Sequence, residues 1–183
     1  MKIELYHGTS AEAADLIMQH GFKDRVAAGR RNWDGHILSK AGFVYLTRAY
    51  PFFYAMNAAG ESEIASVLKV TVDTDDLYPD EDILRFGGVK GTVANMRKYK
   101  HFADIALEKL GNVAIKPEDI SHTIGRKDFK VAEMWQYSDP AMSPINYQVL
   151  GGYYRKLTDT WWDGGDWRSV DQSAEIINQS IKK

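Results

Sequence analysis

Two short segments carry side chains that could bind a flat, charged ligand. They are residues 6–10 (YHGTS) and residues 43–47 (FVYLT). A histidine at a strand end can aim a ring nitrogen at a ligand, and the glycine that follows His7 lets the backbone approach closely. The ring of Tyr45 offers an aromatic face to a flat cationic group, worth ~0.5–2 kcal/mol depending on desolvation. Together the two segments predict a ligand-binding site.

Hydrophobic periodicity predicts the elements that position the first segment. Apolar alternation over residues 2–7 indicates a strand that delivers His7 at its end. Thr9 and Glu12 have the spacing of a capping box, so a helix should follow and end at Gly21. The opening unit is therefore expected to be strand, turn and helix.

The second segment is predicted to be a buried strand over residues 43–46, with Thr47 as a capping residue after the strand. Pro51 suits the first turn of a helix that stops at Gly60. Other expected elements are a long loop over 23–42, a strand over 64–72, a helix from the Thr92 cap to Gly111, strands over 113–116 and 128–137, and helices after Ser143 and over 170–181.

These elements predict an α+β fold, because strands and helices mix without regular βαβ units. The 183 residues suit a single hydrophobic core. We expect a core domain over residues 1–140 and a C-terminal helical extension over residues 141–183 packed on it.

Composition excludes several classes of protein. With 44% hydrophobic and 26% charged residues, the chain is neither disordered nor fibrous. It has no cysteine, which excludes disulfides, thiolate zinc sites and iron–sulfur clusters. The net charge of -2 gives no bulk attraction to a polyanion. We expect a cytoplasmic protein without a signal peptide, membrane partner or bound metal.

Two charged stretches and one aromatic stretch each allow two interpretations. The acidic run 73–82 lacks the spacing of a calcium loop, which favours a solvated loop. The basic stretch 85–101 could contact phosphates, although the wet face of a helix is the favoured interpretation. The aromatics of 147–168 could stack bases or anchor a partner, or pack on the core, which is favoured.

The order of these motifs resembles the ADP-ribosyltransferase fold superfamily. That group uses NAD and includes toxin-like transferases, poly-ADP-ribose polymerases and RNA 2'-phosphotransferases. The likeness covers roughly residues 3–125, and its sharp motifs are the His-Gly-Thr strand end and the Tyr-Leu-Thr strand. The resemblance implies a split, sandwich-like β-sheet with flanking helices, and NAD as co-substrate in the cleft between the two halves.

The resemblance also implies roles for individual residues. His7 would hydrogen-bond an adenosine-ribose hydroxyl, and the Gly8 backbone would pair with the nicotinamide carboxamide. Tyr45 would stack on the nicotinamide ring. The remaining expected NAD contacts are Thr9, Thr47, Tyr54, Arg30 and Asn112.

A carboxylate should assist the reaction, because cleavage of the nicotinamide–ribose bond passes through an oxocarbenium-like state. Where many members of the superfamily carry the catalytic Glu, this chain has Asn112. Three acids could substitute, namely Glu108, Glu118 and Glu133, and with Tyr45 they are the candidate catalytic residues.

The resulting hypothesis is an NAD-dependent ADP-ribosyltransferase, a glycosyltransferase that moves ADP-ribose to a protein or nucleic-acid acceptor and releases nicotinamide. The compact size is compatible with a toxin or phage effector. One alternative is an RNA 2'-phosphotransferase-like enzyme. Another is a non-catalytic module that binds a nucleotide or a partner through the same cleft.

Overall fold

The computed structural model describes residues 1–27, 40–48, 51–60, 63–109 and 111–131. The strands are β1 (Lys2–Ser10), β2 (Val44–Thr47), β3 (Ile64–Asp73), β4 (Tyr78–Pro79), β5 (Asn112–Ile115) and β6 (Ile120–Lys130). The α-helices are α1 (Ala11–Ala27), α2 (Pro51–Ala59), α3 (Glu81–Phe86), α4 (Val93–Lys98) and α5 (Ala103–Lys109). Three 3-10 helices are η1 (Thr74–Asp76), η2 (Lys100–Phe102) and η3 (Pro117–Asp119).

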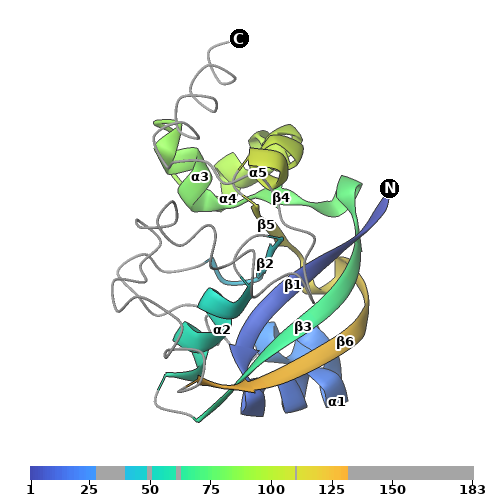
Figure 1. The fold of residues 1–183 in the computed structure, drawn as a ribbon. Helices are drawn as coiled ribbons and strands as arrows, with labels where there is room; N and C mark the ends of the chain where they lie inside the picture. The colour runs from blue at the N-terminus through green and yellow to red at the C-terminus, as the bar shows by residue number, and fades with distance from the viewer. Residues whose placement is uncertain (28–39, 49–50, 61–62, 110, 132–183) are drawn as a thin grey trace.

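The strands of the described residues form one antiparallel sheet in the order β4-β5-β2-β1-β3-β6. Figure 1 shows β1, β3 and β6 as long neighbouring strands, while β2, β4 and β5 are short. The prediction of an α+β fold is confirmed at this level. The C-terminal extension expected over residues 141–183 lies outside the described residues.

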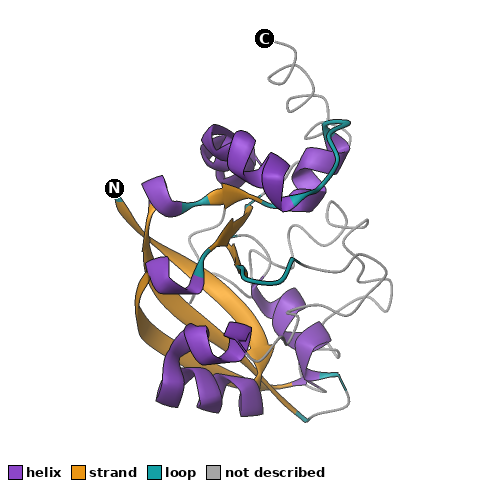
Figure 2. Ribbon diagram, turned by 180° about the vertical axis from the view of Figure 1, so that it is seen from behind, coloured by secondary structure: helices purple, strands orange, loops and turns teal. Residues whose placement is uncertain are grey.

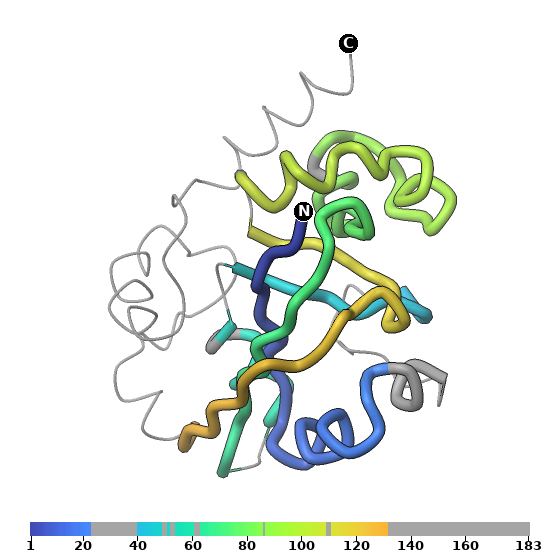
Figure 3. Tube along the Cα trace, turned by 90° about the vertical axis from the view of Figure 1, so that its right-hand side faces the viewer, coloured from blue at the N-terminus to red at the C-terminus, as the bar shows by residue number. Residues whose placement is uncertain are grey.

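Helices cover both faces of the sheet (Figure 2), and two hydrophobic clusters among the described residues lie on opposite faces of β2 and β5. Leu5, Val44 and Leu46 pack with Ile17 and Phe22 of α1. The second cluster lies on the other face, against α3 and α4, and consists of Phe43, Tyr78, Leu84, Met96 and Ala114. Figure 2 shows the helices around the sheet, and Figure 3 shows that α1 and the α3–α5 group lie toward opposite ends of the molecule.

The opening strand differs from the prediction at its end. It continues through Ser10, because Gly8, Thr9 and Ser10 go on pairing with β3, and His7 therefore lies inside the strand. The helix cap is Ser10 rather than Thr9, since the Ala13 N–H donates to the Ser10 Oγ at 3.2 Å.

Two helices were predicted to end at glycines, at Gly21 and at Gly60, and these predictions are confirmed in part. Gly21 interrupts α1 with a φ of 77°, but helical residues resume beyond it as far as Ala27, inside the predicted loop. Gly60 follows the end of α2 with a φ of 58°, as expected.

The predicted helix from Thr92 to Gly111 is not continuous. Thr92 caps α4 through its Oγ1, which accepts from the Asn95 N–H at 3.2 Å. Gly111, after the end of α5, has a φ of 76°. Between them the chain turns through η2, so that Tyr99, His101 and Phe102 gather in one aromatic group. This turn lets α4 and α5 pack on different parts of the core.

The last strand begins earlier than predicted. The pattern favoured 128–137, of which residues 132–137 lie outside the described residues, whereas β6 covers Ile120–Lys130. It is the outer strand beside β3, and most of its residues are partly or fully exposed, so no apolar alternation marks it. None of the helices in the described parts of the chain is long and apolar enough to cross a bilayer.

Candidate functional site

The sheet is narrowest between β1 and β2. These strands register at one residue pair, Tyr6 with Thr47, whereas β1 pairs with β3 along its whole length. The sheet thus consists of two three-stranded halves, β4-β5-β2 and β1-β3-β6, that meet at this pair. The segments with the motifs lie on the strands at this junction.

A row of polar side chains crosses the junction. Tyr6 pairs with Thr47, and Thr47 pairs with Asn112 on β5. Side chains of directly opposed residues share one face of a sheet, so these three lie side by side. The Asn112 Nδ2 donates to the Tyr54 hydroxyl of α2 at 2.9 Å. The predicted site residues that lie at this junction are Thr47, Asn112, Tyr54 and Tyr45, and their contact with a ligand stays a prediction.

One polar atom in this row has no partner in the part of the chain that the structure describes. The Oδ1 of Asn112 is buried, and no hydrogen bond to it is present among the described residues. Exchanging the oxygen and nitrogen of the amide would leave the other end unpaired, since the neighbouring Tyr54 hydroxyl can serve either atom. An unpaired buried polar atom costs about 1–3 kcal/mol, so a donor that reached this oxygen would be stabilising.

His7 is bound to the backbone of β2. Its ring is buried, and Nδ1 lies 3.0 Å from the carbonyl oxygen of Tyr45. A carbonyl oxygen only accepts, so Nδ1 carries the proton of this hydrogen bond. The ring also packs edge-on against Phe22 of α1, with 5.3 Å between ring centroids. His7 therefore holds the two halves of the sheet together, and its contact with a ribose stays a prediction.

Gly8 is in close contact with α2. A Cβ at this position would lie 2.4 Å from the backbone nitrogen of Ala55 and from the backbone oxygen of Pro51. The absence of a side chain therefore lets α2 pack directly on β1, and so positions Tyr54 beside Asn112. The expected pairing of the Gly8 backbone with a carboxamide is not tested by this contact.

Tyr45 lies on the same face of β2 as Thr47 and forms the main polar contact on that face. Its ring packs against the second core cluster. Its hydroxyl donates to the Glu81 Oε2 and accepts from the backbone N–H of Lys40 at 2.9 Å. The rings of His7 and Tyr45 thus contact different parts of the core, and what joins them is the hydrogen bond to the Tyr45 carbonyl.

Glu81 is a functional candidate that the sequence analysis missed. Its side chain is buried, with only 2% of the residue exposed, although the acidic run 73–82 was predicted to be a solvated loop. That prediction is wrong for the end of the run, because Asp80 caps α3 and turns Glu81 inward to Tyr45. The signal in the sequence was the Pro79-Asp80 helix start, which places an acid in the first helical turn.

Burial raises the pKa values of Glu81, Tyr45 and Asp80. Desolvation raises the pKa of Glu81 above its usual value, while the Tyr45 hydroxyl opposes that shift. The pKa of Tyr45 is raised by burial and by the Glu81 charge, so the phenol keeps its proton. Asp80 is partly exposed as a residue, yet the protein around its carboxyl and the neighbouring acids raise its pKa to about 8.

The acidic side chains Asp80, Glu81 and Asp82 have oxygens within 4.8 Å of one another. Protein donors already bind each of them. Tyr45 donates to Glu81, the Asp82 N–H donates to Asp80 at 3.0 Å, and Arg85 donates to Asp82 at 3.1 Å. The cluster is therefore satisfied by the protein's own groups, and it does not indicate a metal site.

The other predicted site residues lie apart from this contact. Glu108 is exposed on α5, and Glu118 is exposed in η3. Thr9 is buried in β1 opposite Ser66. Arg30 and Glu133 lie outside the described residues.

Comparisons of the chain with protein-family models, with curated proteins and with solved structures found no match. The case for a function therefore depends on the geometry of this junction and on the sequence motifs. That geometry offers a buried carboxylate with a fixed orientation, a phenol, and an amide with an unpaired end.

Proposed function

We propose that the chain is an NAD-dependent ADP-ribosyltransferase that moves ADP-ribose to a protein or nucleic-acid acceptor and releases nicotinamide. The observation that carries the proposal is the buried Glu81 carboxylate bound to the Tyr45 hydroxyl. Tyr45 is the residue that the motif pattern assigns to the nicotinamide ring. Glu81 supplies, beside it, the carboxylate that the position of Asn112 lacks.

In the proposed reaction the bond between C1' of the ribose and the nicotinamide nitrogen breaks, and nicotinamide leaves with the electron pair. Positive charge develops on the ribose, and a nearby carboxylate stabilises it. A nucleophilic atom of the acceptor then bonds to C1' and gives its proton to solvent. Glu81 serves as the stabilising anion, because the Tyr45 hydroxyl fixes its orientation and the surrounding protein limits its screening.

The shape of the sheet supports the same proposal. The resemblance implies a sheet split into two halves with the dinucleotide between them, and this sheet has two halves joined at one residue pair. Asn112 and Thr47 lie on the strands beside that junction. The unpaired end of the Asn112 amide can accept or donate to a ribose hydroxyl or to the carboxamide.

The test is to incubate the purified protein and a cell extract with NAD labelled in its adenylate part. The expected result is release of nicotinamide together with label on protein or nucleic acid. Three results would overturn the proposal: no loss of NAD with the folded protein, binding of NAD without turnover, or turnover only with an RNA that carries a 2'-phosphate. The last two are the outcomes expected of the binding module and of the phosphotransferase.

A further inference from the structure

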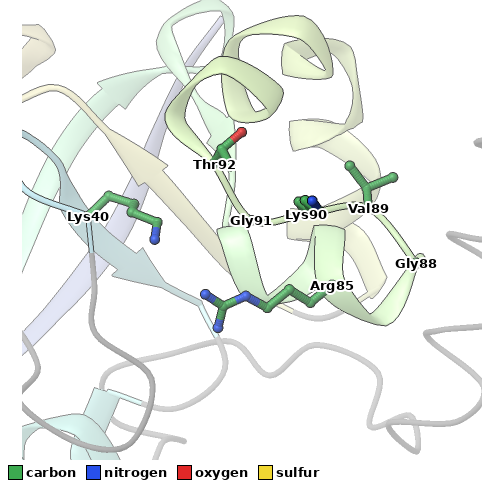
Figure 4. Close-up of a pocket in the computed structure, with 7 residues that line it drawn as sticks. All are labelled: Lys40, Arg85, Gly88, Val89, Lys90, Gly91 and Thr92. Carbon is green, nitrogen blue, oxygen red and sulfur yellow. The ribbon is translucent and has the colours of Figure 1, made fainter.

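An open hollow of about 530 Å³ lies beside the Tyr45–Glu81 pair. The residues that line it are Lys40, Arg85, Gly88, Val89, Lys90, Gly91 and Thr92 (Figure 4). This volume falls within the range of small-molecule sites. The hollow is not part of the row of polar side chains described above. Arg85 and Lys90 belong to the basic stretch 85–101, for which contact with phosphates was the less favoured interpretation of the sequence.

Two contacts connect the hollow to the Tyr45–Glu81 pair. The backbone N–H of Lys40 donates to the Tyr45 hydroxyl at 2.9 Å. Gly91 lies against α3, since a Cβ there would be 2.8 Å from the Glu81 carbonyl oxygen and 2.9 Å from the Glu81 Cβ. Tyr45 and Glu81 do not line the hollow themselves, but each contacts a residue that does.

The hollow is lined by three cationic side chains from separate segments, namely Lys40 before β2, Arg85 near the end of α3, and Lys90 before α4. Figure 4 shows the Lys40 amino group and the Arg85 guanidinium pointing toward the same space. Like charges that face one space repel each other, and an anion between them removes that cost. Among the described residues, Arg85 has one ion pair, with Asp82 at 3.1 Å, and no acid lies within 4 Å of the Lys40 or Lys90 amino groups.

The acids next to the hollow narrow the choice of ligand. Asp82 binds Arg85, and Glu81 lies behind Gly91, so a purely anionic ligand would meet some repulsion. A ligand that carries phosphates at one end and a cationic ring at the other matches both the cationic side chains of the hollow and the acids next to it. Its phosphates would contact the guanidinium and the amino groups, and its ring would lie near Tyr45 and Glu81.

We propose that this hollow binds the phosphate groups of the dinucleotide, through Lys40 and Arg85 with support from Lys90. The inference rests on the proposed function for the source of the phosphates, and it assigns a new phosphate site to the α3–α4 segment. It also predicts a preference for NAD with its charged ring over the reduced form, whose ring is neutral.

The experiment is isothermal titration of the full chain with inorganic pyrophosphate, ADP-ribose, NAD and the reduced dinucleotide. It is run on the wild type, on the Lys40→Gln/Arg85→Gln double variant, and on Arg97→Gln/Lys98→Gln. The last is the matched control, because it removes two positive charges from the exposed final turn of α4. Loss of two charged contacts should weaken ADP-ribose and NAD about tenfold or more, and the control should bind as the wild type does.

The results separate this inference from the proposed function. Equal affinity of the wild type and the Lys40→Gln/Arg85→Gln variant would overturn the phosphate site, even if NAD is cleaved. A selective loss of affinity in that variant supports the site, even if NAD is never cleaved and the transferase proposal fails. If the double variant does not fold, Lys90→Gln and the salt dependence of wild-type binding replace it, and affinity that is unchanged between low and high salt would overturn the site.

Discussion

The Tyr45 hydroxyl binds two neighbours at once. It donates to a buried carboxylate and accepts from the Lys40 backbone, so it fixes Glu81 and the segment that leads into β2 together. A phenol whose pKa is raised keeps its proton and donates throughout the physiological range. At the scale of single residues, this hydrogen bond is the feature that makes a buried Glu81 tolerable.

Replacement of Tyr45 should therefore show coupling to Glu81. In Tyr45→Phe the carboxylate loses its donor while it stays buried, which should cost about 1–3 kcal/mol of the free energy of unfolding. In a Glu81→Gln background the same change should cost less, because a neutral amide is easier to leave unpaired. Urea unfolding of the two single variants and the double variant measures this. Equal costs of Tyr45→Phe in both backgrounds would mean that the two side chains do not interact.

Asp80 gives a prediction for pH. Its pKa is raised to about 8, so between pH 4 and 8 the folded state holds a proton that the unfolded state releases. The contribution of Asp80 to stability is therefore greatest at acidic pH and is lost as pH rises toward 8. Asp80→Asn keeps an acceptor for the Asp82 N–H and removes this loss.

The measurement is the difference in free energy of unfolding between Asp80→Asn and the wild type, at pH 5 and at pH 8. The difference should grow in favour of the variant by about 1–3 kcal/mol across this interval. Taking the difference cancels titrating groups that do not interact with Asp80. Glu81 and Asp82 raise the pKa of Asp80, so their coupling to it is part of the measured difference. A difference that does not change with pH would show that Asp80 titrates normally.

At the scale of elements, the contact between β1 and α2 positions one side of the junction. The missing side chain at Gly8 lets the helix backbone reach the strand, and Tyr54 of that helix then binds Asn112. Backbone atoms cannot move away as a flexible side chain can, so this contact tolerates no added atom.

Gly8→Ala should therefore destabilise the fold strongly, by about 3 kcal/mol or more, and should separate Tyr54 from Asn112. Gly125→Ala is the control, because a Cβ at that strand position would lie 3.6 Å from the Lys69 Cβ, an ordinary contact. It should change stability by less than about 1 kcal/mol. Thermal unfolding of both variants decides the point, and similar melting temperatures would show that α2 does not pack on Gly8 as described.

Elements with a clear apolar pattern could be predicted from the sequence, and elements without one could not. The strand over 64–72 and the helix from Pro51 to Gly60 correspond to β3 and α2. β6 was missed over most of its length, because an outer strand with little burial carries no alternation. The break at η2 depends on packing against the rest of the core, which no local pattern contains.

The candidate site was predicted in part for a similar reason. Strand patterns and glycines located the segments around Tyr45, Thr47 and Asn112, and the structure shows that these segments are adjacent in the sheet. Glu81 was not found, since burial of an acid depends on a hydroxyl 36 positions away in the chain. A run of acidic residues is predicted to be solvated, and the sequence alone does not show which of its side chains the fold will bury.

At the scale of the whole molecule, two half-sheets meet at the pair of Tyr6 and Thr47, and α3 and α4 extend the smaller half. The buried carboxylate lies at the start of α3, and the cationic hollow is lined by Lys40, Arg85 of α3 and the residues that lead into α4. In the proposed function one half of the molecule supplies both the anion for the ribose and the cations for the phosphates. The other half, with β1, supplies the strand that fixes β2 through His7.

The central claim is that Glu81 is the carboxylate of NAD cleavage, and the rate of nicotinamide release tests it most directly. That rate should be measured for the wild type, Glu81→Gln, Glu108→Gln, Glu118→Gln and the control Glu12→Gln, an exposed acid on α1. The account predicts a fall of about 100-fold or more in Glu81→Gln with the fold intact. A full rate in folded Glu81→Gln, or a comparable fall in Glu108→Gln or Glu118→Gln instead, would contradict it.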